Sequence, residues 1–213
     1  MSPAVLRPGQ TADADPRLIG RFLDVIEGEI IPLTREGVRQ GNKIFGAALI
    51  RKTDLSTILA ATNRETENPL WHGEIATINA YYAMVNADEG TRIDPKNTIF
   101  LATHEPCTLC ASAIAWGGYE NVYYLFSHED SRDAFQIGHD LKILKEVFGH
   151  EPGGYARANA YWSAFSLVDL VERCGSEDRE RFRAQVARIG AAYAEVSKVY
   201  QARKGEARNI PLK

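Results

Sequence analysis

The order of the apolar segments between residues 15 and 135 is the feature that most limits which folds this chain can form. Apolar and charged residues alternate at helical spacing from about Asp15 to Val38. The segments 44–52 and 56–63 then read as two strands of a hairpin. A helix from Gly73, a strand at 97–103, a helix from Cys107 and a strand at 121–126 follow. This order predicts an α/β fold, with a mixed sheet and helices on both of its faces.

Three further helices are expected after residue 130, at 141–149, 161–174 and 177–204. The last of these has apolar residues spaced for one buried stripe, so we expect it to pack on the core or on a second subunit. We divide the chain into a loose N-terminal segment (1–14), a main domain (15–175), and a C-terminal helix and tail (176–213).

Composition and charge narrow the class of partner. Hydrophobic residues make up 45% of the 213 residues and the formal net charge is −3, with a pI near 6.0. This balance is typical of a globular protein and gives no electrostatic footprint for nucleic acid or an anionic membrane. The first residues lack the apolar core of a signal peptide, and no stretch approaches the roughly 20 apolar residues of a membrane span. A cytoplasmic protein is the expectation.

Two of the three cysteines, Cys107 and Cys110, form a close pair at an expected helix start, directly after Pro106. An odd number of cysteines argues against a disulfide framework. The pair alone is compatible with half of a zinc site, a redox pair or two small buried residues. The positive end of the helix dipole favours thiolates, the form that binds metal. We interpret Cys174, far along the chain, as a small buried hydrophobe.

His72 and Glu74 extend the cysteine pair into a candidate catalytic centre. His72, Cys107 and Cys110 together supply one nitrogen and two sulfurs. Three protein ligands with a fourth position open are typical of a catalytic zinc. Glu74 follows His72 by two residues, so its carboxylate can approach a zinc-polarised water and move its proton. A metal-bearing scaffold without catalysis and a thiol–disulfide oxidoreductase are the alternatives from other classes.

The two motifs His72-Gly73-Glu74 and Pro106-Cys107-Thr108-Leu109-Cys110 resemble the zinc-binding motifs of the cytidine deaminase superfamily. The resemblance spans roughly residues 40–135. It implies a three-layer α/β/α cytidine-deaminase-like fold with a mixed sheet and extra C-terminal helices. It also implies a Zn²⁺-dependent aminohydrolase that replaces an exocyclic amine with oxygen and releases ammonia. In this family the backbone amide at the position of Cys107 helps to place the attacking water.

A narrower resemblance concerns the substrate. Glu105-Pro106-Cys107, the helix that carries Trp116, and Phe45-Gly46-Ala47 resemble the bacterial guanine deaminases and the tRNA adenosine deaminases. That likeness implies a small heterocyclic amine as substrate and a homodimeric assembly. The residues that it implies for the substrate pocket are Phe45, Asn63, Gly73, Trp116 and Asp130.

Other substrates stay open at this point. The His-Gly-Glu stretch resembles fungal cytosine deaminase, and Gly73 indicates only that a small residue is needed near the metal. We favour guanine narrowly over cytosine, and place a pterin or s-triazine deaminase behind both. A tRNA adenosine deaminase is disfavoured, because it needs a basic groove for phosphates. Tyr155, Tyr161 and Trp162 are candidates for a lid over the pocket.

Overall fold

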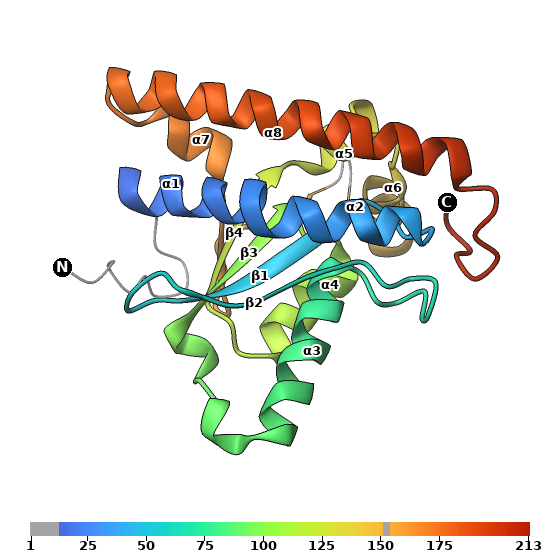
Figure 1. Ribbon diagram of the computed structural model, residues 1–213, viewed down its shortest axis with the longest axis horizontal. Helices are drawn as coiled ribbons and strands as arrows, with labels where there is room; N and C mark the ends of the chain where they lie inside the picture. Colours follow the sequence, from blue (N-terminus) through green and yellow to red (C-terminus); the bar gives the residue numbers. More distant parts are fainter. Residues whose placement is uncertain (1–12, 151–153) are drawn as a thin grey trace.

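The computed structural model describes residues 13–150 and 154–213, so the expected loose segment at 1–14 lies outside the described residues except for residues 13 and 14. Its centre is a five-stranded sheet with the order β2-β1-β3-β4-β5 (Figure 1). β1 is antiparallel to both β2 and β3, whereas β3, β4 and β5 run parallel. The mixed sheet is confirmed. The strands are β1 (Gly46–Arg51), β2 (Thr57–Thr62), β3 (Thr98–His104), β4 (Asn121–Phe126) and β5 (Ser163–Ser166).

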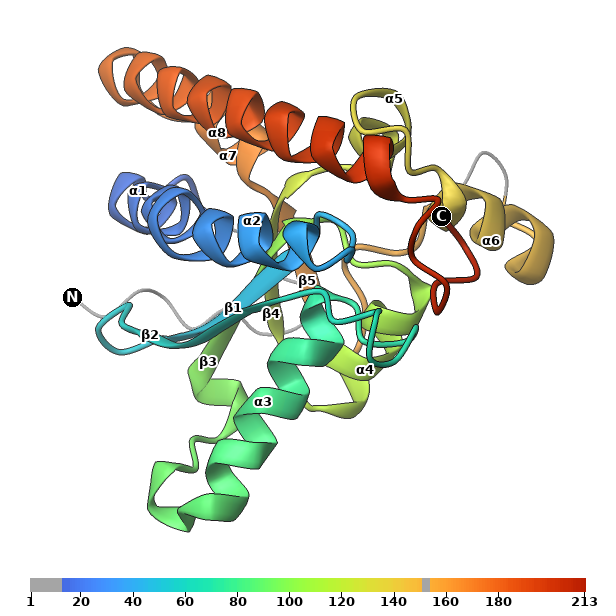
Figure 2. The same ribbon diagram turned by 45° about the vertical axis from the view of Figure 1, so that its right-hand side comes forward.

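Helices cover both faces of the sheet, which confirms the three-layer arrangement (Figures 1 and 2). One face carries α1 (Pro16–Val25), α2 (Ile31–Arg39), α7 (Leu167–Glu172) and α8 (Ser176–Arg203). The other face carries α3 (Gly73–Ala87) and α4 (Thr108–Trp116). Two 3₁₀ turns, Glu89–Thr91 and Pro95–Asn97, lead from α3 to β3. α5 (His128–Asp133) and α6 (His139–Phe148) follow β4.

The N-terminal helix contains one π-helical turn, Ile26–Ile30, between α1 and α2. The amide of Ile31 bonds to the carbonyl of Ile26, five residues back. Pro32, which follows directly, has no amide proton for the ordinary helical bond to Gly28. The wider turn therefore absorbs the proline while α1 and α2 continue along the same face of the sheet.

Each face of the sheet has its own apolar core, and β3 contributes to both. Leu101 is buried toward α1 and α8, whereas Phe100 is buried toward α3 and α4. Successive side chains of a strand point to opposite faces, so a strand covered on both sides is buried along its whole length. All seven residues of β3 are buried. Cys174 lies in the first of these cores, as expected.

The segment 161–174 was expected to be one helix, and this prediction is wrong in its first half. Residues 163–166 form β5, which pairs with β4, and only 167–172 are helical. Ser166 ends the strand and caps α7, because its hydroxyl accepts from the amide of Asp169. The six-residue helix α5 was not predicted.

The long C-terminal helix was expected at 177–204 and is found at 176–203 as α8. Its buried residues include Ile189, Tyr193 and Tyr200, which pack on the first core. Gln185 also donates hydrogen bonds to Asp24 of α1 and to Glu27. α8 therefore packs on the main domain. No helix within residues 13–150 and 154–213 combines the length and hydropathy needed to cross a bilayer.

Candidate metal centre and substrate pocket

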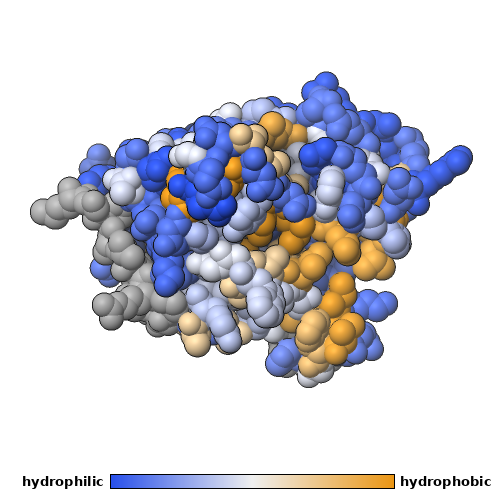
Figure 3. Space-filling view, turned by 90° about the horizontal axis from the view of Figure 1, so that it is seen from below, coloured by the Kyte–Doolittle hydropathy of each residue, from blue (hydrophilic) through white to orange (hydrophobic). Residues whose placement is uncertain are grey.

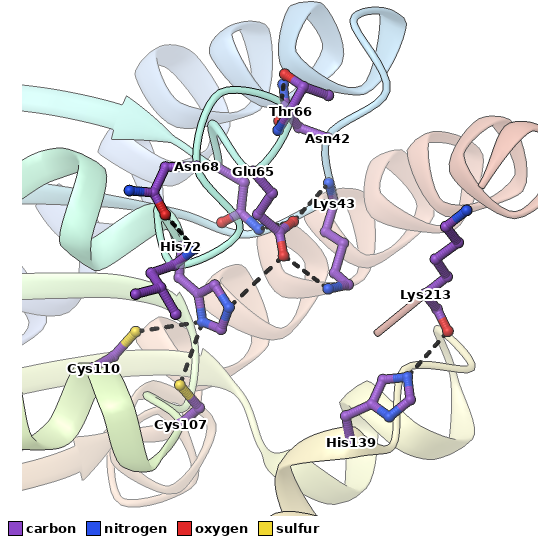
Figure 4. A network of polar contacts seen from close by, with 12 residues as sticks. Asn42, Lys43, Glu65, Thr66, Asn68, His72, Cys107, Cys110, His139 and Lys213 are labelled. Atoms are coloured by element: carbon purple, nitrogen blue, oxygen red, sulfur yellow. Dashed lines mark hydrogen bonds and ion pairs between the residues drawn. The ribbon is translucent and has the colours of Figure 1, made fainter. Parts of the chain in front are cut away.

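The predicted metal ligands come together at the starts of α3 and α4. His72 and Cys107 are the residues that precede the two helices, and both have extended backbones without a side-chain capping bond. Their side chains are therefore free to face each other. Nδ1 of His72 lies 3.4 Å from Sγ of Cys107 and 3.7 Å from Sγ of Cys110. Figure 4 shows both sulfurs on the same side of the imidazole.

The three ligand atoms fit a tetrahedral zinc site. All lie within 4.8 Å of one another. Bonds of about 2.0 Å to nitrogen and 2.3 Å to sulfur place tetrahedral ligand atoms roughly 3.3–3.8 Å apart, close to the distances found here. One nitrogen and two sulfurs form the donor set of several catalytic zinc sites, and the fourth position is left for water.

Charges in the cluster favour a bound cation. A hydrogen bond from Cys110 holds the pKa of Cys107 well below its usual range, although burial opposes this shift. Burial, together with the charge on Cys107, raises the pKa of Cys110. Burial acts to lower the pKa of His72, but the interaction with Cys107 outweighs it and raises this pKa to about 9. Negative charge thus concentrates on Cys107, beside the nitrogen of His72.

Glu74 lies in the first turn of α3 and is 6% exposed. Burial, and then the charge of Cys107, raises its pKa to about 7. The carboxyl group faces a small cavity of about 20 Å³. This volume accommodates about one water molecule. The cavity is lined by Phe45, His72, Glu74, His104, Glu105, Cys107, Cys110 and Asp140.

A second, larger cavity of about 390 Å³ adjoins the first, and the two share Phe45, His72, Cys107 and Asp140. Lys43, Glu65, Thr108 and His139 supply further polar lining. Apolar side chains form the rest of its wall. The space-filling view of the molecule from below shows hydrophobic residues gathered toward the right of the picture (Figure 3). The apolar lining residues besides Phe45 are Pro69, Leu70, Leu109, Ile137, Ile143, Ile210, Pro211 and Leu212.

The C-terminal tail forms one wall of this larger cavity. Ile210 is buried, and Pro211 and Leu212 line the cavity beside it. The side chain of Asn209 donates to the carbonyl of Thr66 at 2.9 Å. Nε2 of His139 lies 3.0 Å from the carbonyl oxygen of Lys213 (Figure 4). The tail is thus attached on both sides of the pocket.

The residues expected to form a lid lie elsewhere. Tyr155, Tyr161 and Trp162 line a separate hollow of about 310 Å³ on the outer side of α4. Trp162 is buried in the second core, and the hydroxyl of Tyr155 donates to the carbonyl of Pro106. The tail, rather than these aromatic residues, covers the metal pocket.

Two predicted pocket residues lie next to the metal ligands. Phe45 lines both cavities. Gly73 has no room for a side chain, because a Cβ there would come within 2.8 Å of the Cα of Gly46. A small residue is therefore needed at this position so that the start of α3 can approach the backbone of β1.

The structure does not bring the other three predicted residues to a cavity wall. Trp116 is 92% exposed at the end of α4. Asp130 accepts from the amide and hydroxyl of Ser127, in a capping box that begins α5. Asn63 is fully buried, and its side-chain amide donates to Glu65 at 2.8 Å. None of the three is among the described residues that line either cavity.

The prediction from sequence missed Asp140. It lies in the first turn of α6 and lines both cavities. The other acidic residues among the described lining are Glu65, Glu74 and Glu105. Burial raises the pKa of Asp140 to about 6, with a further contribution from the charge of Cys107. No pattern in the sequence marks this aspartate, because the folding of α6 over α4 brings it to the metal centre.

Comparison with known proteins supports the same reading of the motifs. Residues 30–126 match the zinc-binding region of cytidine and deoxycytidylate deaminases. The chain therefore contains a deaminase-type zinc-binding region over these residues. The match includes His72, Glu74, Cys107 and Cys110. Together with the ligand geometry, it makes the protein a zinc-binding deaminase, and the prediction of a Zn²⁺-dependent hydrolytic enzyme is confirmed.

Among solved structures, the chain is similar to a tRNA:A34 deaminase at 20% identity, covering 74% of this chain and 97% of the other, with a TM-score of 0.44. It is similar to guanine deaminase from Nitrosomonas europaea at 15% identity (85% and 87% covered, TM-score 0.47). Guanine deaminase from Bacillus subtilis is 21% identical (78% and 91% covered, TM-score 0.45). A comparison with curated proteins found no match.

Proposed function

We propose that the protein deaminates a free nucleobase or a related amino-heterocycle by hydrolysis, with guanine as the favoured substrate and cytosine as the second candidate. The observation that carries this proposal is the position of Glu74. Its buried carboxyl group shares a cavity the size of one water molecule with His72, Cys107 and Cys110. A proton carrier beside a water site and a metal site is the arrangement that hydrolytic deamination needs.

The residues divide the chemistry between them. His72, Cys107 and Cys110 hold zinc, which supplies a Lewis acid that makes water acidic enough to attack at neutral pH. Glu74 accepts a proton from the attacking water and delivers it to the adjacent ring nitrogen, and it then carries the remaining hydroxyl proton to the departing amine nitrogen. The carbon–nitrogen bond breaks, ammonia leaves, and the water oxygen remains on the ring carbon as a carbonyl. The burial of Glu74 supports this role, because it raises the pKa of the carboxyl group to about 7. A group with such a pKa can both take and give a proton near neutral pH.

The wall of the larger cavity favours a free heterocycle over a nucleic acid. RNA binding needs accessible lysine and arginine side chains along the phosphates. Lys43 is the only lysine or arginine among the described lining residues, and it is buried in an ion pair with Glu65. The remaining surface is largely apolar, which suits the faces of a flat ring. We assign Phe45 to one of these faces.

Asp140 supports guanine as the first candidate. A carboxylate accepts hydrogen bonds, so it selects a ring edge that presents N–H groups. Guanine presents a ring N–H next to the departing 2-amino group, and Asp140 can accept from that N–H. The NH2 group of Asn63 donates to Glu65, and Asn63 is not among the described residues that line either cavity. We therefore propose that Asp140 binds the edge of the base.

A panel of substrates tests the proposal. Ammonia release is measured for zinc-loaded protein with guanine, cytosine, adenine, their nucleosides, isocytosine, a pterin, an s-triazine and a tRNA anticodon stem. We expect turnover of guanine above the other compounds. Turnover of the RNA stem alone would contradict the argument from the apolar cavity. Turnover of cytosine in preference to guanine would select the second candidate and leave the mechanism unchanged.

A further inference from the structure

The imidazole of His72 has one nitrogen toward the metal site and the other toward a buried carboxylate (Figure 4). Nδ1 faces the two cysteine sulfurs, whereas Nε2 lies 3.7 Å from Oε1 of Glu65. A neutral histidine that binds metal through Nδ1 carries its proton on Nε2. Glu65 therefore lies on the side of the ring where a hydrogen-bond acceptor is needed. A shift of about 1 Å brings the two atoms to ordinary hydrogen-bond distance.

Glu65 is fixed by three donors. Oε1 accepts from Nζ of Lys43 at 2.7 Å. Oε2 accepts from the side-chain amide of Asn63 at 2.8 Å and from the backbone amide of Lys43 at 3.3 Å. Glu65 is 1% exposed and Lys43 is 6% exposed. The carboxylate thus has little freedom to turn, and the oxygen nearest to His72 is the one that Lys43 holds.

A buried ion pair is weak evidence for a purely stabilising role. Moving two charges out of water is costly, and an apolar pair of similar size is often as stable. The position of this pair directly behind a metal ligand suggests a different use. Carboxylates that accept from the free nitrogen of a metal-binding histidine fix its ring orientation and make it a stronger ligand.

We propose that Lys43 and Glu65 are positioning residues for zinc: Glu65 holds His72 in the tautomer that binds metal through Nδ1, and Lys43 holds Glu65. Neither Lys43 nor Glu65 binds the zinc ion itself. The proposal depends on the zinc site and is independent of which heterocycle is the substrate, so a failure of the substrate panel leaves it standing.

Zinc affinity measures this role directly. Glu65→Gln keeps the shape of the side chain and removes its charge. We expect the zinc dissociation constant, measured by competition with a chelating dye, to rise about 10- to 100-fold. Glu67→Gln is the matched control, because Glu67 lies on the same loop but is exposed and paired with Arg64. This control should bind zinc as the wild type does.

A second readout separates positioning from stability. Visible absorption of the Co²⁺-loaded protein reports the ligand field, so a displaced His72 changes the spectrum of Glu65→Gln and not that of Glu67→Gln. The melting temperature of each metal-free variant is measured alongside. Equal zinc affinity and identical Co²⁺ spectra for folded Glu65→Gln and wild type would overturn the proposal, whatever the melting temperatures.

The double variant Lys43→Met/Glu65→Gln covers the case in which an unpaired Lys43 prevents folding. Both charges are removed together, and such neutral replacements of buried pairs are often tolerated. We expect the double variant to lose zinc affinity to the same extent as Glu65→Gln. Wild-type affinity in the folded double variant would show that the pair does not act on His72.

Discussion

Arg157 forms two hydrogen bonds with the buried carboxylate of Glu105, at 2.7 Å and 2.9 Å, across 52 positions of the sequence. Glu105 directly precedes Pro106 and the metal ligand Cys107. The hydroxyl of Tyr155 donates to the carbonyl of Pro106 at 2.8 Å. The segment before β5 therefore holds the turn that presents the cysteine pair, which gives part of the C-terminal third a structural role at the metal centre.

Arg157→Met should loosen this turn. Glu105 would stay buried without its cation, and we expect the free energy of unfolding to fall by about 2–3 kcal/mol, less than for a fully buried pair because Arg157 is partly exposed. Zinc affinity should fall as well, and both are measured by denaturant unfolding and chelator competition. Arg132→Met is the control, because Arg132 pairs with Asp133 at the surface. Equal effects of the two substitutions would refute the role of Arg157.

Because His104 is buried, we expect the free energy of unfolding to fall in mild acid. Burial lowers its pKa to about 3, with a smaller contribution from His128. In the unfolded chain this pKa is near 6.5, so between pH 6.5 and 3 the unfolded state binds a proton that the folded state does not. Stability should therefore fall as the pH drops through this range, by about 1.4 kcal/mol per pH unit from this group.

His104→Phe tests this pH dependence. The ring is surrounded by Phe45, Phe126, Phe135 and Tyr193, so an aromatic replacement fits the same space. The variant loses the hydrogen bond with Thr103. This loss should lower its free energy of unfolding by about 1 kcal/mol at pH 7. Its unfolding free energy should then decline less steeply than that of the wild type below pH 6.5. An exposed histidine replaced in the same way, His150→Phe, should keep the wild-type slope, and parallel slopes for all three proteins would contradict the prediction.

Asp140→Asn tests the recognition of the ring edge. An amide carries no charge, so its oxygen is a weaker acceptor than a carboxylate oxygen for the ring N–H of guanine. We expect kcat/KM for guanine to fall by about 10- to 100-fold, mainly through KM, with the zinc content unchanged. Asp133→Asn, at the exposed end of α5, serves as the control. A normal KM for guanine in Asp140→Asn would remove this residue from the substrate site.

A substitution of Trp116 distinguishes two roles for this residue, one in a subunit interface and one in a pocket wall. We propose that the protein forms a homodimer and that this exposed side chain belongs to the contact with a second copy. Trp116→Ser should then lower the dimer fraction in light scattering. A variant that remains dimeric but has a raised KM would instead support a place for Trp116 in the pocket wall.

The metal centre was predictable because its signal is local. His72 with Glu74, and Cys107 with Cys110, each lie within one helical turn, so the spacing alone places their side chains at two helix starts. The first four strands were predictable for a similar reason, since each is a short apolar run. β5 was missed because its four residues run directly into α7, and the whole stretch has the apolar content of a helix.

The surroundings of the metal centre were not predictable in this way. Glu65, Asp140 and Arg157 reach the centre through loops and through the packing of α6, and no periodic pattern records that packing. Asp130 illustrates the opposite error. An acid shortly after β4 was expected in the pocket, but the local hydrogen bonds with Ser127 use its carboxylate to begin α5.

Ammonia release by zinc-loaded Glu74→Gln, compared with the wild type on guanine or on whichever compound of the panel the wild type turns over, tests the central claim most directly. Zinc content and thermal stability are measured on the same samples. The account predicts that the variant keeps its zinc and its fold while kcat falls by at least about 100-fold, because the proton carrier is lost. A variant that contains zinc and releases ammonia at the wild-type rate would contradict the role of Glu74.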